Sequence, residues 1–113
     1  MLPNINRLKK KKDFEKVFKE GKSFSQGFLF LKINKNKLNI SRFGFIVSKK
    51  VSKKAPVRNK IKRRLREITR SKMPKIKNGI DCIIIVLSGL ENLSFSKIEE
   101  SINKIFKKAK IYV

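Results

Sequence analysis

The longest amphipathic pattern in the chain lies between Ala55 and Lys72. Apolar residues recur there every three or four positions, which is the spacing of one helix face: Val57, Ile61, Leu65 and Ile68. Pro56 stands where the first turn of a helix can spare a backbone N–H. The pattern therefore predicts a helix over residues 55–72 with one buried face.

Two shorter stretches also show helical spacing. Residues 13–21 begin with Asp13 and end at Gly21. Their apolar face consists of Phe14, Val17 and Phe18. Near the end of the chain, Ser96 and Glu99 have the spacing of a capping box at the start of a helix. The stripe that this last helix would bury consists of Ile98, Ile102, Ile105, Phe106 and Ala109.

Alternation with a period of two predicts the strands. The segment 28–34 has Phe28, Phe30 and Lys32 on one face and Leu29, Leu31 and Ile33 on the other. Residues 42–48 read as a second strand, in which Gly44 leaves room for a close approach to the backbone. A polar turn at residues 35–39 joins the two, so we expect a hairpin. Residues 80–87 are the most apolar segment and predict an interior strand covered on both faces.

These elements form one domain over residues 1–113, since a chain of this length supports one modest core. Their order is helix, strand pair, basic helix, central strand and helix. It predicts an α+β sandwich in which helices cover a small sheet. Residues 1–12 show little apolar periodicity and include the run of lysines from Lys9 to Lys12. We expect them to form a basic, extended and flexible arm.

The charge of the chain indicates the kind of partner. With 31 basic and 8 acidic residues, the formal net charge is +23, which favours nucleic acid or an anionic membrane. A membrane anchor would need a long apolar run or a basic helix with a broad apolar face, and neither is found. The basic N-terminal stretch leads into Asp13 without a signal-peptide core. We therefore expect a cytoplasmic protein with no membrane partner.

The chain lacks the residues that several kinds of catalytic chemistry require. There is no histidine, so a Ser-His-Asp triad or a His-ligated metal is excluded. No cysteine pair is available for zinc, and no glycine-rich phosphate loop occurs. The eight acidic residues are scattered along the sequence, so they offer few clustered carboxylate ligands for a two-metal nuclease site. We expect no catalytic residues and no metal ligands, and we interpret Cys82 as a core residue.

The predicted helix over residues 55–72 carries far more charge than a helix needs. Eight of its eighteen residues are Lys or Arg, against the single acid Glu67. The lysines of the preceding loop extend the same patch. Such like charges repel, so a polyanion that neutralises them explains their number. For Phe14 and Phe18 two interpretations stay open: the pattern favours core positions, but a partly exposed ring could stack on an unpaired base.

Several of these segments resemble the bacterial ribonuclease P protein family. The resemblance is carried by VSKK at 47–50, Ala55, Val57-Arg58-Asn59, Lys62-Arg63 and Arg66. NRLKK at 6–10 and DFEKVFKEG at 13–21 are similar to the family's opening, and IIIV at 83–86 is similar to its last strand. The motifs occur in the family's order over roughly residues 6 to 109.

Two positions depart from the family pattern. The family's Arg-Asn-Arg reads Arg58-Asn59-Lys60 here, so an ammonium replaces a guanidinium that could hold a phosphate with two N–H groups. Ser52 stands where the family usually has glycine, which bears on the backbone of the loop. Neither change removes a charge.

The resemblance implies an αβββαβα sandwich with a small four-stranded mixed sheet and a left-handed β-α-β crossover, like the second domain of ribosomal protein S5. The general rule would predict a right-handed crossover. An additional short strand would fall around residues 23–26, where periodicity shows none. The implied activity is endonucleolytic removal of the 5′ leader from precursor tRNA, by a ribonucleoprotein whose RNA subunit is the catalyst.

The resemblance also implies partners and site residues. The partners are the ribonuclease P RNA subunit and precursor tRNA, with no obligatory protein partner. Mg²⁺ would be held by the RNA and the substrate. The residues implied to contact the catalytic RNA are Arg58, Asn59, Lys60, Lys62, Arg63 and Arg66. Those implied to line the groove for the 5′ leader are Phe14, Phe18, Phe30, Lys32, Lys49, Lys50 and Lys53.

Two alternatives belong to other functional classes. A ribosomal or other structural RNA-binding protein can have the same size and charge, so composition does not separate it from a ribonuclease P protein. An autonomous nuclease would need the catalytic and metal-binding groups that the chain lacks. Cleavage assays with and without a ribonuclease P RNA would separate the three.

Overall fold

The elements follow the order that the resemblance implies. The computed structural model describes residues 2–113. Its main elements are α1 (Lys11–Glu20), β1 (Lys22–Gln26), β2 (Leu29–Lys35), β3 (Arg42–Val47), α2 (Ala55–Lys72), β4 (Ile80–Val86) and α3 (Phe95–Lys108). Short 3-10 turns lie at Asn4–Asn6, Met73–Lys75 and Leu90–Asn92. The αβββαβα order is confirmed, including the short first strand, and the helix predicted over residues 55–72 has those bounds.

The sheet has the strand order β1-β2-β4-β3, so the predicted hairpin between β2 and β3 is wrong. β4 lies between them, antiparallel to β2 and parallel to β3, and Ile84 is flanked by Leu31 and Phe45. The physical reason is burial: β4 is the most apolar strand, and only a central position covers both of its faces. β2 instead forms its hairpin with β1, through a turn at Gly27 whose φ is 56°.

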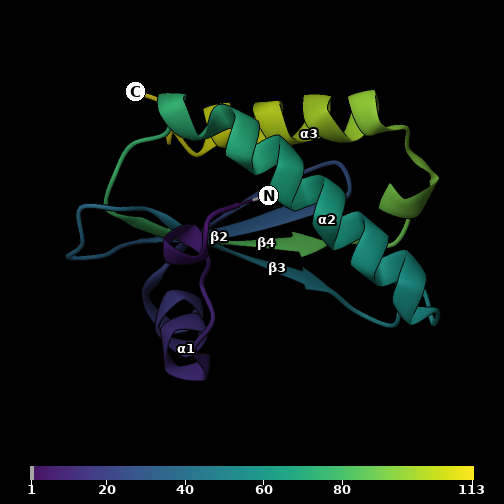
Figure 1. The fold of residues 1–113 in the computed structure, drawn as a ribbon, viewed down its shortest axis with the longest axis horizontal. Helices are drawn as coiled ribbons and strands as arrows, with labels where there is room; N and C mark the ends of the chain where they lie inside the picture. The colour runs from purple at the N-terminus through teal and green to yellow at the C-terminus, as the bar shows by residue number, and fades with distance from the viewer. Residues whose placement is uncertain (1) are drawn as a thin grey trace.

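The helices cover both faces of the sheet (Figure 1). α2 and α3 lie on one face, and α1 lies on the other. β3 and β4 point the same way, and α2, in front of α3 in this view, packs over β3 while α3 packs over β1 and β2. The chain therefore passes from β3 through α2 to a strand that lies further back. This is a left-handed crossover, as the resemblance implies.

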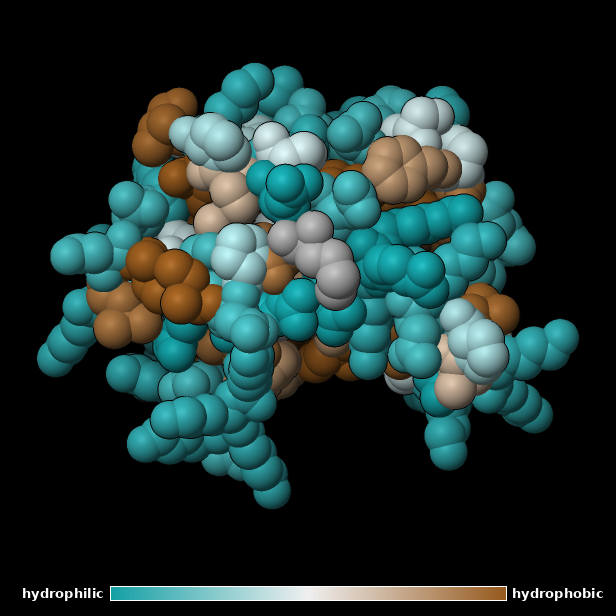
Figure 2. Space-filling model, in the orientation of Figure 1, coloured by the Kyte–Doolittle hydropathy of each residue, from teal (hydrophilic) through white to brown (hydrophobic). Residues whose placement is uncertain are grey.

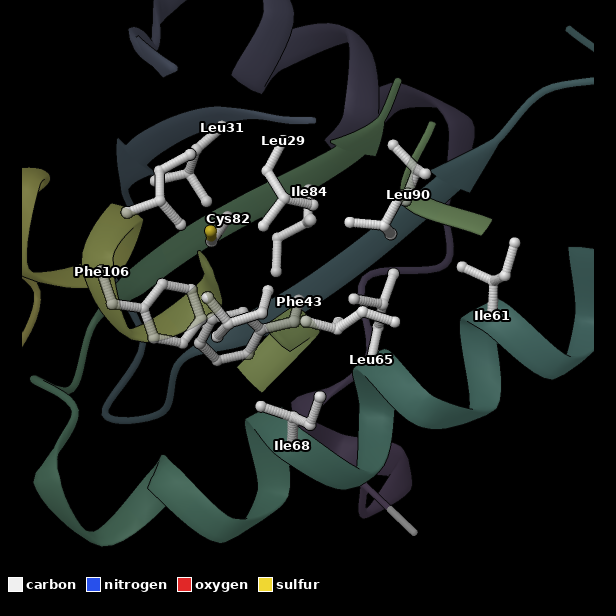
Figure 3. Close-up of a cluster of buried hydrophobic side chains, with 14 of the residues drawn as sticks. Leu29, Leu31, Phe43, Ile61, Leu65, Ile68, Cys82, Ile84, Leu90 and Phe106 are labelled. Atoms are coloured by element: carbon white, nitrogen blue, oxygen red, sulfur yellow. The ribbon is translucent and has the colours of Figure 1, made fainter. Parts of the chain in front are cut away.

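The main core lies between the sheet and the pair α2 and α3 (Figure 3). Side chains from β2, β3 and β4 point toward the apolar stripe of α2 and toward Phe106 of α3. The rings of Phe43 and Phe106 are 6.1 Å apart between centroids. Ile61, Leu65 and Ile68 are buried as predicted, while Val57 at the end of the stripe is only partly buried. Cys82 is fully buried, which confirms it as a core residue.

A second, smaller cluster holds α1 on the opposite face. Leu8, Val17 and Ile83 are buried there, with Phe14 packed against them. Gly44 makes this packing possible, because a Cβ atom at that position would lie 2.5 Å from Cζ of Phe14. The close approach predicted at Gly44 is therefore made by the ring of Phe14.

Residues 2–8 are packed against the domain, which differs from the basic, extended and flexible arm expected over residues 1–12, while Lys9 to Lys12 are exposed. Leu2 and Leu8 are 1% and 5% exposed, and the amide of Leu8 donates to the carbonyl oxygen of Phe43 at 2.8 Å. The side chain of Asn6 donates to the carbonyl oxygen of Ser41 at 2.8 Å. Two anchors six residues apart are too few for any periodicity to reveal them. Met1, the first residue of the predicted arm, lies outside the described residues.

The N-cap of α3 differs from the sequence prediction by two residues. Its N-cap is Ser94, whose hydroxyl accepts from the amide of Lys97 at 3.4 Å, and not Ser96. Ser94 and Lys97 have the same three-residue spacing as the predicted capping box, and the helix begins at Phe95. The buried stripe is confirmed for Ile98, Ile102, Ile105 and Phe106, and Ala109 is partly buried beyond the last turn.

Candidate nucleic-acid interface

The first candidate surface is the basic flank of α2. Arg58, Lys62 and Arg66 follow one another at intervals of four residues and are each partly exposed. With a rise of about 1.5 Å per residue, the three side chains start from points that span about 12 Å of the helix axis. Asn59 and Arg63 are exposed on the same polar side, whereas Lys60 is exposed on the opposite flank of the helix. The structure therefore brings Arg58, Lys62 and Arg66 together on one accessible flank with Asn59 and Arg63, while Lys60 lies apart from them.

The loop before α2 is fastened to its first turn. Nη1 of Arg58 donates to the carbonyl oxygen of Ser52 at 2.9 Å. The hydroxyl of Ser52 accepts from the amide of Lys54 at 3.2 Å, which closes a tight turn just before the helix. Serine at this position thus supplies a hydrogen bond that glycine could not make. The bond to Ser52 also fixes the direction of the Arg58 side chain while engaging one of its five N–H donors.

Arg7 extends the basic surface, although it was not among the predicted site residues. Its Nε donates to the carbonyl oxygen of Leu2 at 2.9 Å, so the packed N-terminal segment holds the side chain in place. Burial lowers the pKa of Arg66, and the nearby positive charge of Arg7 lowers it further. Two guanidinium groups are therefore held close together at some electrostatic cost. The NRLKK motif at residues 6–10 was the only signal for Arg7.

The second candidate surface lies on the other face of the sheet, beside α1. Phe30 and Lys32 of β2 pair with Ile85 and Ile83 of β4, and Ile83 packs in the cluster under α1. Nζ of Lys32 donates to the carbonyl oxygen of Phe18 at 3.2 Å, which ties the strand to the helix.

The burial of its aromatic residues answers the question that the sequence left open. Phe14 is partly buried against Gly44, whereas Phe18 is 40% exposed. Phe30 is also partly exposed. These phenylalanine rings are therefore partly buried and partly exposed, and this face combines aromatic rings held by packing with the side chain of Lys32.

The β3–α2 loop joins the two surfaces. Lys49, Lys50 and Lys53 are exposed on it, and the carbonyl oxygen of Lys50 accepts from the hydroxyl of Ser88 at 2.8 Å. Figure 2 shows the face over which α2 runs, and hydrophilic side chains cover most of it. The predicted site residues thus fall on two surfaces on opposite faces of the sheet, with the loop lysines between them.

No cluster of three or more His, Cys, Asp or Glu residues that could hold a metal ion occurs within residues 2–113. Over the same residues, no helix has the length and apolar character needed to cross a membrane.

Fold and surface together define a small α+β domain of the nucleic-acid-binding class. The ribonuclease P family model matches residues 2–110. The chain is 40% identical over 111 residues to the ribonuclease P protein component of Fusobacterium nucleatum, covering 95% of this chain and 99% of that protein. It is also 40% identical to the ribonuclease P protein component of Clostridium kluyveri, covering 96% of this chain and 98% of that one. The chain belongs to the ribonuclease P protein family.

Solved structures agree with this assignment. The ribonuclease P protein of Staphylococcus aureus superposes with a TM-score of 0.89 at 31% identity, over 96% of this chain and 98% of that one. The ribonuclease P protein of Thermotoga maritima gives a TM-score of 0.82 at 34% identity, over 90% and 96%. These comparisons support the ribonuclease P interpretation, and none of them favours a ribosomal protein.

Proposed function

We propose that this ribonuclease P protein uses its two surfaces for two RNA segments. The basic flank of α2 binds the catalytic RNA subunit, and the surface beside α1 binds the single-stranded 5′ leader of precursor tRNA. The observation that carries the proposal is the alignment of Arg58, Lys62 and Arg66 along one accessible flank of a helix anchored by the core.

The α2 surface acts through phosphates. Arginine and lysine side chains that neutralise phosphates release condensed counterions, which makes binding strong at low salt and fixes the register of the RNA. A phosphate beside Arg66 would also relieve its repulsion with Arg7. Lys60 contributes a point charge where the family's arginine would offer a fork, so its contact has less directional preference.

The surface beside α1 suits an RNA strand of variable sequence. Partly exposed rings of Phe14, Phe18 and Phe30 can stack on any base, because every base has a π-face. Lys32 and the loop lysines would hold the phosphates of the same strand. A surface of this kind binds leaders without requiring a particular sequence.

The chemical step belongs to the RNA. The scattered acids of this chain offer no carboxylate cluster within residues 2–113, so its residues do not fit a Mg²⁺ site, and we assign the metal to the RNA and the substrate. The protein contributes positive charge that reduces repulsion between phosphates near the cleavage site. We assign the chain to cytoplasmic tRNA processing, as the noncatalytic subunit of an endoribonuclease, without an obligatory protein partner.

Reconstitution tests this function directly. Precursor tRNA is incubated with a bacterial ribonuclease P RNA at low salt and near-physiological Mg²⁺, with and without the protein. We expect the protein to increase the rate of leader removal, and the protein alone to cleave nothing. Lack of stimulation would favour a structural RNA-binding protein, and cleavage without RNA would indicate an autonomous nuclease.

The α2 surface is tested by the salt dependence of RNA binding. Lys62→Ala and Arg66→Ala should each weaken binding and reduce the slope of log K against log salt by about one unit per lost phosphate contact. Lys107→Ala on α3 removes the same charge from an exposed position outside both surfaces, and its slope should match the unmodified protein. Unchanged slopes in both α2 variants would mean that this flank faces solvent in the complex.

A further inference from the structure

A cleft of about 720 Å³ lies outside both candidate surfaces, where the ends of β2 and α3 meet the start of β4. Its apolar lining includes Phe24, Ile33 and Ile80. Five lysines also line it: Lys22, Lys35, Lys77, Lys108 and Lys110. The volume falls in the range of roughly 300–1,000 Å³ that is usual for ligand sites. An apolar interior with a cationic rim suits a ligand that has a flat apolar part and an anionic part.

The lysines of this cleft outnumber its acids. Among residues 2–113, Glu20 is the only acidic residue in the lining. The ion pairs found among residues 2–113 involve none of the five lysines. Nζ of Lys108 donates to the carbonyl oxygen of Ser25 at 2.9 Å, which holds one ammonium at the rim. The cleft is therefore a concentrated positive field around an apolar centre.

The chain end builds one wall of the cleft. The amide of Lys77 donates to the carbonyl oxygen of Ile111 at 2.8 Å, and the amide of Val113 donates to that of Lys75 at 2.8 Å. These bonds pair the last residues with the segment before β4. Ile111 is 1% exposed, so the wall is anchored in the core.

The backbone at Lys110 gives a second, independent observation. Lys110 has a φ of 57°, and it is the one non-glycine residue with positive φ in the part of the chain that the structure describes. Its amide donates to the carbonyl oxygen of Lys107, and that of Ile111 donates to Phe106, which is the Schellman pattern at a helix end. Glycine is the favoured residue at this position. A lysine stands there at a cost in stability, and its charge adds to the positive rim of the cleft.

We propose that this cleft binds one unpaired nucleotide of an RNA strand, with its base against Phe24 and its neighbouring phosphates against the lysine rim. The choice of RNA as the source rests on the proposed function, and charge complementarity supports it. The half-buried ring of Phe24 offers a stacking surface, and the lysines stand where flanking phosphates would lie. The protein would thus hold RNA at a third place, away from α2 and from the leader surface.

Methyl and aromatic NMR signals of the labelled full-length protein test the proposal. The probes are adenosine 5′-monophosphate, a three-nucleotide oligoadenylate, adenosine and inorganic phosphate. We expect saturable shifts at Ile33, Ile80 and Phe24 with the monophosphate, and at least threefold tighter binding of the oligonucleotide. No shift at these residues overturns the proposal. The same shifts with inorganic phosphate would show an adventitious ion only. Equal affinity for adenosine 5′-monophosphate and the oligoadenylate would exclude RNA as the source.

Lys110→Gly separates binding from folding. Because glycine adopts positive φ without strain, this variant should unfold at a higher temperature than the unmodified protein. Its nucleotide affinity, measured at Ile33 and Ile80, should nevertheless fall at least threefold. Lys107→Ala, which loses the same charge outside the cleft, should keep full affinity. Unreduced affinity in Lys110→Gly overturns the proposal, whereas the salt slopes of Lys62→Ala and Arg66→Ala test the α2 surface separately.

Discussion

Gly44→Ala should damage stability and leader binding together. A Cβ atom at Gly44 would lie 2.5 Å from Cζ and 2.7 Å from Cε1 of Phe14. Normal carbon–carbon contact is about 3.5–4.0 Å, so the ring must retreat by about 1 Å or more. Overpacking of this kind costs about 1–3 kcal/mol. Thermal unfolding should therefore occur roughly 4–12 °C lower, by the scaling for domains of this size.

The displaced ring should also weaken the leader contact. A stacked base contributes about 1–3 kcal/mol, which corresponds to a loss of roughly 5- to 150-fold in affinity. The assay compares the affinity of the reconstituted complex for precursor tRNA with its affinity for mature tRNA, which has no leader. We expect Gly44→Ala to reduce the preference for the precursor and to leave binding of mature tRNA unchanged.

Gly27→Ala provides the matched control. Gly27 has a φ of 56°, so a side chain there is strained, but no atom lies within 4 Å of the added Cβ. Its expected cost is about 1–2 kcal/mol, similar to that of Gly44→Ala, with no effect on Phe14. Equal leader preference in the two variants would show that the loss follows from stability alone. If Gly44→Ala left the stability unchanged, the close packing of the Phe14 ring against Gly44 would be refuted.

Three further predictions concern other parts of the fold. Arg42→Ala should lower the free energy of unfolding by about 3 kcal/mol in denaturant titrations. The reason is that the buried carboxylate of Asp81 loses its two hydrogen bonds from the guanidinium, of 2.8 and 2.6 Å. A loss below about 1 kcal/mol would contradict this. Burial raises the pKa of Tyr112, the single tyrosine, from 10.0 to about 12, and the charge of Glu99 adds to the effect. Because the pKa of Tyr112 is higher in the folded state than in the unfolded state, its contribution to stability is complete below pH 10 and is lost as pH rises toward 12. Ultraviolet titration of the folded protein should show the raised pKa, and a midpoint near 10 would disprove it. Burial raises the pKa of the Cys82 thiol well above its usual value, so thiol reagents should modify it only at the rate of unfolding, and fast labelling of the folded protein would contradict the burial.

Local patterns predicted the helices of this fold well because their signals lie within one element. The stripe on α2 and the proline in its first turn fix the bounds of that helix from a single stretch of sequence. The predicted buried face of α3 was correct for the same reason. Its cap was misplaced from Ser94 to Ser96 because two serines two residues apart both fit the pattern.

Pairing between strands could not be predicted in the same way. The turn at residues 35–39 suggested that β2 and β3 are neighbours, but pairing depends on which strand has both faces to bury. That property belongs to β4, which is more than thirty residues further along the chain than β3. The left-handed crossover follows only from the family resemblance, because the general rule favours the opposite hand.

For the candidate sites too, features within one element were predicted, and features that depend on distant segments were not. Arg58, Lys62 and Arg66 were predicted to share a flank, since they recur every four residues within one helix. Arg7 was missed because its position beside Arg66 depends on the anchoring of Leu2 and Leu8. The cleft beside Lys110 was missed because its lining comes from residues 20–35, 77–80 and 108–111, which lie far apart in the sequence.

The ring of Phe14 packs in the space left by Gly44, and this contact links the surface beside α1 to the chain segment that leads to the α2 surface. Gly44 lies on β3, and β3 leads through the lysine-rich loop into α2. A shift of α1 would therefore press on the strand that positions the start of the basic helix. The hydrogen bond from Arg58 to Ser52 holds that loop against the first turn of α2, so an anchored segment connects the strand that contacts Phe14 with the α2 surface. An anchored connection of this kind suits the proposed function, in which the protein would align the single-stranded end of a substrate with an RNA catalyst.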